Sequence, residues 1–84
     1  MNIVFSPQAW EDYQYWRSAN APLLDRINRL LADACRSPID GIGKPEPLKY
    51  GIAGAWSRRI TAEHRLVYRV VGDDLELISV GYHY

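Results

Sequence analysis

Four side chains of this 84-residue sequence have the chemistry needed to cleave RNA without a metal ion. Glu46 is a carboxylate that could take the proton from a ribose 2′-hydroxyl. Arg65 could hold the neighbouring phosphate with its planar guanidinium and stabilise the charge that develops there. Histidine is the side chain best suited to proton transfer near neutral pH, so His83 could protonate the departing 5′-oxygen. The ring of Tyr84 could stack on a splayed base.

Glu46 lies between two prolines in the segment 43–49, Gly-Lys-Pro-Glu-Pro-Leu-Lys. A residue that precedes proline is pushed out of the helical region, so we expect Lys44 and Glu46 both to be extended. Each proline also fixes its own φ, which stiffens the backbone that carries the carboxylate. This stiffness suits a group whose direction matters. The alternative is a rigid turn with a solvated glutamate, because most carboxylates lie exposed on protein surfaces.

Positive charge is concentrated in the middle of the sequence although the net charge is zero. Residues 1–43 carry four basic and five acidic side chains, a net charge of −1. Residues 44–69 carry six basic and two acidic side chains, a net charge of +4, and residues 70–84 contribute three acidic ones. We therefore expect a polyanion to bind the middle segment.

The arginines of this segment follow the alternating pattern of two neighbouring strands. If Thr61 pairs with His64 across the turn, three arginines share one face and Arg59 points to the other. The three are Arg58, Arg65 and Arg69. A bulge would reverse these faces. The arginines could contact phosphates, or they could form only surface ion pairs with Glu63 or Glu76, each of which contributes little to stability.

The sequence ends in Tyr82-His83-Tyr84. Chain ends usually fray, and an aromatic-histidine-aromatic end could simply be the edge of the core. The preceding residues 75–80 alternate as a strand does and should fix the direction of this tail. The sequence therefore leaves two interpretations of the tail, a structural one and a catalytic one.

The elements that must position these residues can be expected from periodicity and breakers. Ser6-Pro7 provides an N-cap followed by proline in the first turn, and Ser37-Pro38 ends a second helix. In chain order we expect a strand over 2–5, a helix from 7 to about 17, a second helix with an apolar stripe over 23–34, a loop over 37–47, and strands over 56–61, 65–71 and 75–82. The fold class is α+β, with the helices on one face of a twisted antiparallel sheet meander and the other face available for binding.

Length and composition indicate one domain over 1–84 that is rich in apolar and aromatic residues. Its core is small, so it is expected to gain stability from a partner or a second copy. Cys35 is the single cysteine, and no Cys/His spacing suggests a metal site. The sequence shows neither a signal peptide nor an apolar run of membrane-spanning length, so we expect a soluble cytoplasmic protein.

Four strings follow one another along the chain in a characteristic order. They are 43–49 (Gly-Lys-Pro-Glu-Pro-Leu-Lys), 54–60 (Gly-Ala-Trp-Ser-Arg-Arg-Ile), 63–68 (Glu-His-Arg-Leu-Val-Tyr) and the terminal His83-Tyr84. Their sequence and spacing closely resemble the Txe/YoeB toxins of the RelE-like superfamily, over the whole chain. The resemblance implies a RelE-like fold with a short N-terminal strand before the two helices.

The resemblance also implies a function and its partners. The protein would be the toxin of a type II toxin–antitoxin system, a ribosome-dependent mRNA endonuclease that acts in the decoding site and inhibits translation. It would cleave without a cofactor and leave a 2′,3′-cyclic phosphate. Its partners would be a YefM-like antitoxin and a second copy of itself in a homodimer.

The residue roles implied by the resemblance match the chemistry above. Glu46 would be the general base, Arg65 the phosphate stabiliser and His83 the general acid, while Tyr84 would position the nucleotide or shape the site. The further RNA contacts expected in the positive segment are Lys44, Lys49, Arg58 and Arg59, of which Lys49 and Arg59 match basic positions of the family.

One position departs from the family pattern, because relatives often carry Cys-Arg where this chain has Val80-Gly81. We therefore expect this chain to lack a basic contact with RNA or the ribosome there. Two alternatives to the toxin nuclease remain open at the level of sequence. One is a catalytically silent RNA- or ribosome-binding module, and the other is an interaction domain whose apolar groove receives another chain.

Overall fold

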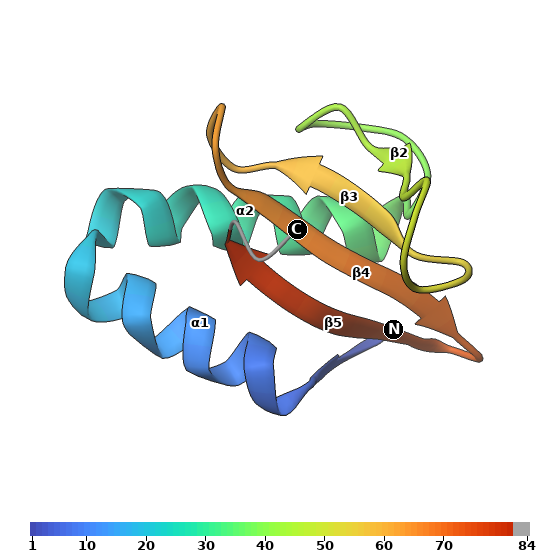
Figure 1. Cartoon of the computed structure of the whole chain (residues 1–84), viewed down its shortest axis with the longest axis horizontal. Coiled ribbons are helices and arrows are strands. Elements are labelled where there is room, and N and C mark those ends of the chain that lie inside the picture. Colours follow the sequence, from blue (N-terminus) through green and yellow to red (C-terminus); the bar gives the residue numbers. More distant parts are fainter. Residues whose placement is uncertain (82–84) are drawn as a thin grey trace.

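Both helices lie on one face of a five-stranded sheet in the computed structural model, which describes residues 1–81 (Figure 1). The strands are β1 (Asn2–Phe5), β2 (Glu46–Pro47), β3 (Trp56–Arg59), β4 (Arg65–Val71) and β5 (Asp74–Gly81), and the helices are α1 (Pro7–Ala19) and α2 (Ala21–Arg36). The order of the strands in the sheet is β1-β5-β4-β3-β2. The predicted α+β fold, with two helices on one face of the sheet, is confirmed.

Two strands depart from the predicted antiparallel meander. β1 pairs parallel with β5, with Asn2 opposite Asp74, so the sheet is mixed. A parallel pair needs a long connection between its strands, and the intervening helices and strands supply it. β2 forms inside the predicted loop, where Glu46 pairs with Ser57 and Pro47 with Trp56 of β3.

The two helices begin and end where polar side chains satisfy their free backbone groups. The Ser6 hydroxyl accepts from the backbone N–H of Ala9 at 3.0 Å and donates to the Ile78 carbonyl at 2.7 Å, so the cap of α1 also fixes α1 to β5. Asn20 ends α1 and caps α2, because its side chain accepts from the backbone N–H of Leu23 at 3.2 Å. The predicted break between the helices is thus one residue long.

The core lies between α2 and the centre of the sheet. The buried stripe of α2 consists of Ile27, Leu30, Leu31 and Ala34. It packs in one cluster with the buried side chains Ile60, Leu66, Tyr68, Leu75, Leu77 and Val80. A register shift in the pairing of β4 with β5 lies between Val67 and Tyr68, which keeps Leu77 and Val80 on the same face. None of the helices within residues 1–81 is long and apolar enough to span a membrane.

The turn between β3 and β4 corrects the predicted faces of the arginines. The carbonyl of His64 accepts from Ile60 at 2.9 Å and from Thr61 at 3.2 Å, so the pairing starts one residue earlier than expected. The Thr61 hydroxyl supports this turn by accepting from the backbone N–H groups of Glu63 and His64.

The resulting register places Arg59 opposite Arg65 and Arg58 opposite Leu66. Residues that face each other across an antiparallel pair share one face of the sheet. Arg59, not Arg58, therefore lies with Arg65 on the face away from the helices, which we call the open face. Arg58 points towards the helices, and the prediction that put it with Arg65 is wrong.

Candidate active site

Two of the predicted catalytic residues meet on the open face, although they lie nineteen positions apart in the sequence. The Arg65 guanidinium, on β4, donates from Nη1 to Oε1 of Glu46, on β2, at 2.7 Å. The same Nη1 donates to the Ser57 hydroxyl on β3 at 3.2 Å. Because β3 lies between β2 and β4 in the sheet, Ser57 lies between the strands that carry the two candidate catalytic groups.

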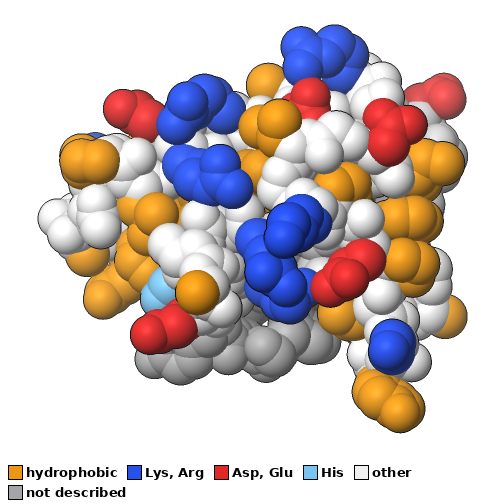
Figure 2. Space-filling view, turned by 90° about the horizontal axis from the view of Figure 1, so that it is seen from above, with side chains coloured by type: hydrophobic (Ala, Val, Ile, Leu, Met, Phe, Trp, Pro, Cys, Tyr) orange, Lys and Arg blue, Asp and Glu red, His pale blue; other side chains and the backbone are white. Residues whose placement is uncertain are grey.

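An open pocket of about 280 Å³ surrounds this pair. Its lining residues are Glu46, Pro47, Leu48, Lys49, Ser57 and Arg65. Seen from above, Lys and Arg side chains gather over this side of the molecule, with acidic side chains among and beside them (Figure 2). A carboxylate, a guanidinium and an ammonium group therefore border one space that is accessible from solvent.

The charges around Glu46 lower its pKa. The hydrogen bond from Arg65 and its positive charge hold the pKa of Glu46 below its ordinary value of 4.5, and the charges of Arg59 and Lys49 add to this. Glu46 is therefore a carboxylate at neutral pH, which is the form that can accept a proton. If a phosphate bound Arg65 in place of Glu46, the main cause of the lowered pKa of Glu46 would be lost. Glu46 would then be a stronger base.

The remaining basic residues of the positive segment lie in three different places. Arg59 is exposed and lies opposite Arg65 on the open face. Lys49 is exposed and lines the pocket. Lys44 is exposed but does not line it. Lys44 has a φ of 51°, so the prediction that it is extended is wrong.

Arg58 is completely buried, which contradicts its predicted contact with RNA. Its Nε donates to the Tyr68 hydroxyl at 2.9 Å, and its Nη1 donates to Oδ2 of Asp33 at 2.6 Å. The other donors of the guanidinium reach backbone carbonyls, those of Ile42 at 3.1 Å, Ser37 at 2.6 Å and Asp40 at 2.9 Å. These five bonds use all five N–H groups of the side chain, so none is left for a phosphate.

Sequence reasoning missed the two partners of Arg58. Asp33 lies on α2, and Arg58, Arg36 and the backbone N–H of Ile42 all donate to its carboxylate. These bonds, with that of Ile42 first, lower the pKa of Asp33 from 3.8 to about 2. Burial raises the pKa of Tyr68, whose hydroxyl also donates to the Pro38 carbonyl at 2.6 Å.

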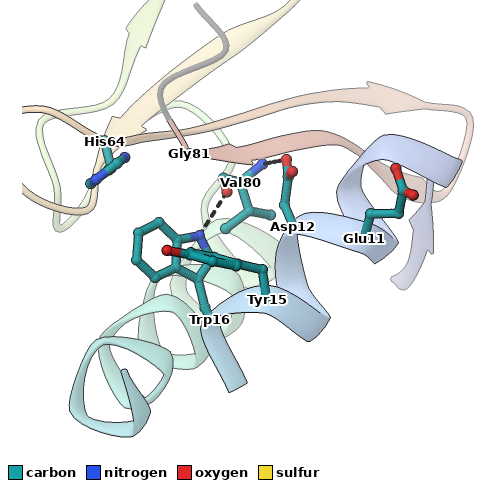
Figure 3. Close-up of a pocket in the computed structure, with 7 residues that line it drawn as sticks. All are labelled: Glu11, Asp12, Tyr15, Trp16, His64, Val80 and Gly81. Carbon is teal, nitrogen blue, oxygen red and sulfur yellow. Dashed lines mark hydrogen bonds between the residues drawn. The ribbon is translucent and has the colours of Figure 1, made fainter. Parts of the chain in front are cut away.

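His83 and Tyr84 lie outside the described residues, but the strand that leads to them is fixed at its end. The indole Nε1 of Trp16 donates to the Val80 carbonyl at 2.8 Å, and the Val80 N–H donates to Oδ2 of Asp12 at 2.8 Å (Figure 3). Both partners come from α1. A second pocket of about 420 Å³ lies here, lined by the residues drawn in Figure 3.

Comparison with known proteins decides the family. Residues 5–84 match the model of the YoeB-like toxins of bacterial type II toxin–antitoxin systems. The chain is 48% identical to the toxin YoeB of Escherichia coli K12 over 84 residues, which is all of both chains. This chain belongs to the YoeB-like toxin family. The predicted resemblance to Txe/YoeB toxins is confirmed.

Solved structures of the family have the same fold. A YoeB/ParE toxin from Agrobacterium tumefaciens matches with a TM-score of 0.94 and 50% identity over the full length of both chains. The YoeB of a dimer from Staphylococcus aureus matches with a TM-score of 0.92 and 47% identity, over 100% of this chain and 98% of that one. A YoeB–YefM heterotetramer has also been solved from S. aureus. YafQ of E. coli, at 20% identity and a TM-score of 0.71, shares the fold.

Proposed function

We propose that this protein is the toxin of a type II toxin–antitoxin pair and that it stops translation by cutting mRNA on the ribosome. Membership of the YoeB-like toxin family supports the first part of the proposal. The observation that supports the second part is the 2.7 Å pair of Glu46 and Arg65 in an open pocket bordered by Lys49. A base and a phosphate-binding cation are side by side there, as transfer within an RNA strand requires.

The proposed reaction is an attack within one nucleotide. Glu46 takes the proton from the 2′-hydroxyl, and the 2′-oxygen forms a bond to the adjacent phosphorus. The bond from phosphorus to the 5′-oxygen breaks, and His83 gives a proton to that oxygen. Arg65 stabilises the charge on the phosphate oxygens meanwhile, and Tyr84 positions the nucleotide. The products are a 2′,3′-cyclic phosphate and a 5′-hydroxyl end.

Binding of the RNA would use the basic residues of the open face. Arg59 and Lys49 are exposed beside the Glu46–Arg65 pair and would contact phosphates on either side of the cleaved bond. Lys44, two residues before Glu46, would contact the backbone farther along. The site of action would be the decoding site of ribosomes in the cytoplasm.

The protein would also form two kinds of assembly. A YefM-like antitoxin would bind and inactivate it, as the YoeB–YefM complex of S. aureus suggests. A homodimer would add buried surface to a small core, and the S. aureus YoeB dimer supports that expectation.

Two glutamate substitutions on the same face of the sheet test the proposed chemistry. Glu46→Gln removes the proposed base, and we expect mRNA cleavage on translating ribosomes to fall by about 10²–10⁴-fold. Glu76→Gln is the matched control, because it breaks the 2.8 Å pair with Arg69 outside the pocket. Its cleavage should equal that of the original protein. Cleavage sites are mapped by primer extension, and the 3′ ends are analysed for cyclic phosphate.

The same assay separates the proposal from its alternatives. Cleavage by a folded Glu46→Gln variant at the original rate would reject Glu46 as the base. Intact mRNA, with the original protein bound to ribosomes, would favour a silent binding module instead. Omission of ribosomes from a parallel reaction tests whether cleavage depends on them.

A further inference from the structure

The loop before Glu46 is fastened to the core by the buried guanidinium of Arg58. Three carbonyl groups of this loop accept from Arg58, and they belong to Ser37, Asp40 and Ile42. A fourth, that of Pro38, accepts from Tyr68, and the N–H of Ile42 donates to Asp33. The backbone from 37 to 42 is therefore fixed by three side chains that come from α2, β3 and β4.

The loop needs these hydrogen bonds because three of its residues have positive φ angles, which most residues avoid. Gly41 and Gly43 have φ values of 118° and 81°, and Lys44 has a φ of 51°. Positive φ is disfavoured for a residue with a side chain. A β-carbon at Gly41 would lie 2.0 Å from Oδ2 of Asp33, and one at Gly43 would lie 2.6 Å from Cδ2 of Leu30. The loop thus packs directly on the groups that hold it.

The strand that carries Glu46 has few hydrogen bonds of its own. β2 consists of Glu46 and Pro47 only, and the prolines at 45 and 47 have no N–H to donate. Close to β2, Gly43 accepts from the Arg59 N–H at 2.7 Å and Leu48 donates to the Ala55 carbonyl at 2.9 Å. Besides its pairing with Ser57 of β3, the direction of Glu46 depends on the chain on either side of it, and Ile42 is four residues away.

We propose that Arg58, with Asp33 and Tyr68, is a positioning group that sets the carboxylate of Glu46 against the guanidinium of Arg65. Replacing a buried ion pair by apolar residues is often neutral or stabilising, so burial of a charge here points to conformational specificity rather than to core stability alone. The effect of this group on mRNA cleavage rests on the proposed function, whereas its effect on the position of the Glu46 carboxylate does not. None of these three residues touches the substrate in the proposal.

Tyr68→Phe tests the proposal with the least damage to the core. It keeps the buried ring and removes the hydroxyl that accepts from Arg58 and donates to Pro38. Tyr13→Phe is the matched control, since it removes a tyrosine hydroxyl that donates to Asn28 between the two helices. Arg58→Lys is the stronger variant, because one ammonium group cannot replace five donors in a planar fork.

The primary measurement is the titration of Glu46 followed by NMR, with glutamate labelled at its side-chain carboxyl carbon. Glu46→Gln identifies the signal among the four glutamates. In the original protein the pKa lies below 4.5 because Arg65 is held against the carboxylate. We expect it to rise towards 4.5 in Tyr68→Phe and further in Arg58→Lys, and to stay unchanged in Tyr13→Phe. This readout needs neither RNA nor ribosomes.

The second measurement is mRNA cleavage over a range of ribosome concentrations up to saturation. We expect Tyr68→Phe to lower kcat by about 10–10²-fold, the cost of a displacement of about 1 Å of a reacting group, with KM unchanged. An unchanged Glu46 titration in a folded Tyr68→Phe variant and in Arg58→Lys would overturn the proposal. If Arg58→Lys does not fold, Tyr68→Phe alone decides.

The two measurements separate the positioning role from the proposed function. If the original protein cuts no mRNA but its Glu46 titration responds as expected, the positioning role stands and the proposed function fails. If mRNA is cut and the titration does not respond, the positioning role alone is rejected.

Discussion

Two arginine–carboxylate pairs lie on opposite faces of the same sheet. On the helix-covered face Arg58 lies 2.6 Å from Asp33, and on the open face Arg65 lies 2.7 Å from Glu46. The distances are almost equal, but the exposures are not. The side chains of the first pair are 0% and 14% exposed, and those of the second are 30% and 55% exposed. Distance alone therefore does not distinguish a structural pair from one that can act on a ligand.

The two pairs differ in how many N–H groups of the arginine already donate to the protein. All five N–H groups of Arg58 donate to protein acceptors. Within residues 1–81, Arg65 donates only from Nη1, to Glu46 and Ser57, which leaves Nε and Nη2 for a ligand. A planar guanidinium with two free nitrogens suits a phosphate oxygen pair. The guanidinium of Arg58 is fixed by the fold, whereas that of Arg65 has two nitrogens that could bind a ligand, as the proposed reaction requires.

The largest expected effect comes from breaking the buried pair. Arg58→Ala removes five hydrogen bonds and leaves Asp33 and the loop carbonyls without their donor, so we expect a loss of about 3–5 kcal/mol in the free energy of unfolding. Arg59→Ala, one residue later, removes an exposed side chain and should change this free energy by less than about 0.5 kcal/mol. Urea unfolding followed by tryptophan fluorescence measures both variants.

The same two variants should have the opposite order of effects on RNA binding. Arg59→Ala is expected to weaken binding of an RNA oligonucleotide and to reduce the dependence of that binding on salt. Equal losses of stability in both variants would show that the burial of Arg58 has no energetic consequence, and the comparison of the two faces would then fail.

An effect of intermediate size is expected from Arg65→Lys on the open face. Lysine keeps the charge but lacks the planar fork that can direct separate N–H groups to Glu46 and to two phosphate oxygens, so cleavage on ribosomes should fall by about 10²–10³-fold. Stability should change by less than about 1 kcal/mol, because the pair is partly exposed. Arg69→Lys, which alters the neighbouring pair with Glu76, is the control and should cleave normally.

The sequence singled out the residues of the open-face pair but not those of the buried pair. Glu46 and Arg65 each lie in a motif, and the structure places them 2.7 Å apart, whereas their catalytic roles stay a prediction. The face of each arginine could not be predicted, because it depends on a single residue of the turn at Thr61, whose hydroxyl accepts two backbone N–H groups. Shifting the register by one residue exchanges the two faces of a strand.

The buried network was not predictable from local patterns. Asp33 and Arg58 are 25 positions apart, and neither residue type by itself indicates a core position. A loop over 37–47 was expected, but what packs against its residues Gly41 and Gly43 is a tertiary property that no spacing in the sequence records. Residues of a local motif can be recognised in the sequence. The contacts that position them are made between segments that are far apart in the sequence.

The smallest expected effect is a difference in how the two pairs respond to acid. The pKa of Asp33 is lowered from 3.8 to about 2 in the folded protein, so its contribution to stability is fully present above pH 3.8 and is lost as the pH falls through about 2. The pKa of Glu46 is also lowered, from 4.5, so its contribution is present above pH 4.5 and is lost as the pH falls through its folded value. Glu46 is more than half exposed, and solvent screens its pair with Arg65.

Urea unfolding between pH 7 and pH 2 separates these contributions. As the pH falls, the unfolded chain takes up the proton of each carboxyl before the folded chain does, so protonation favours unfolding. Asp33→Asn removes one such group and should flatten the decline of stability below pH 4, whereas Glu46→Gln should leave the curve almost parallel to that of the original protein. If Glu46→Gln flattened the curve as much as Asp33→Asn, the open-face pair would be as firmly fixed as the buried one. Arg65 would then lack the freedom to exchange a carboxylate for a phosphate, and the proposed chemistry would lose its basis.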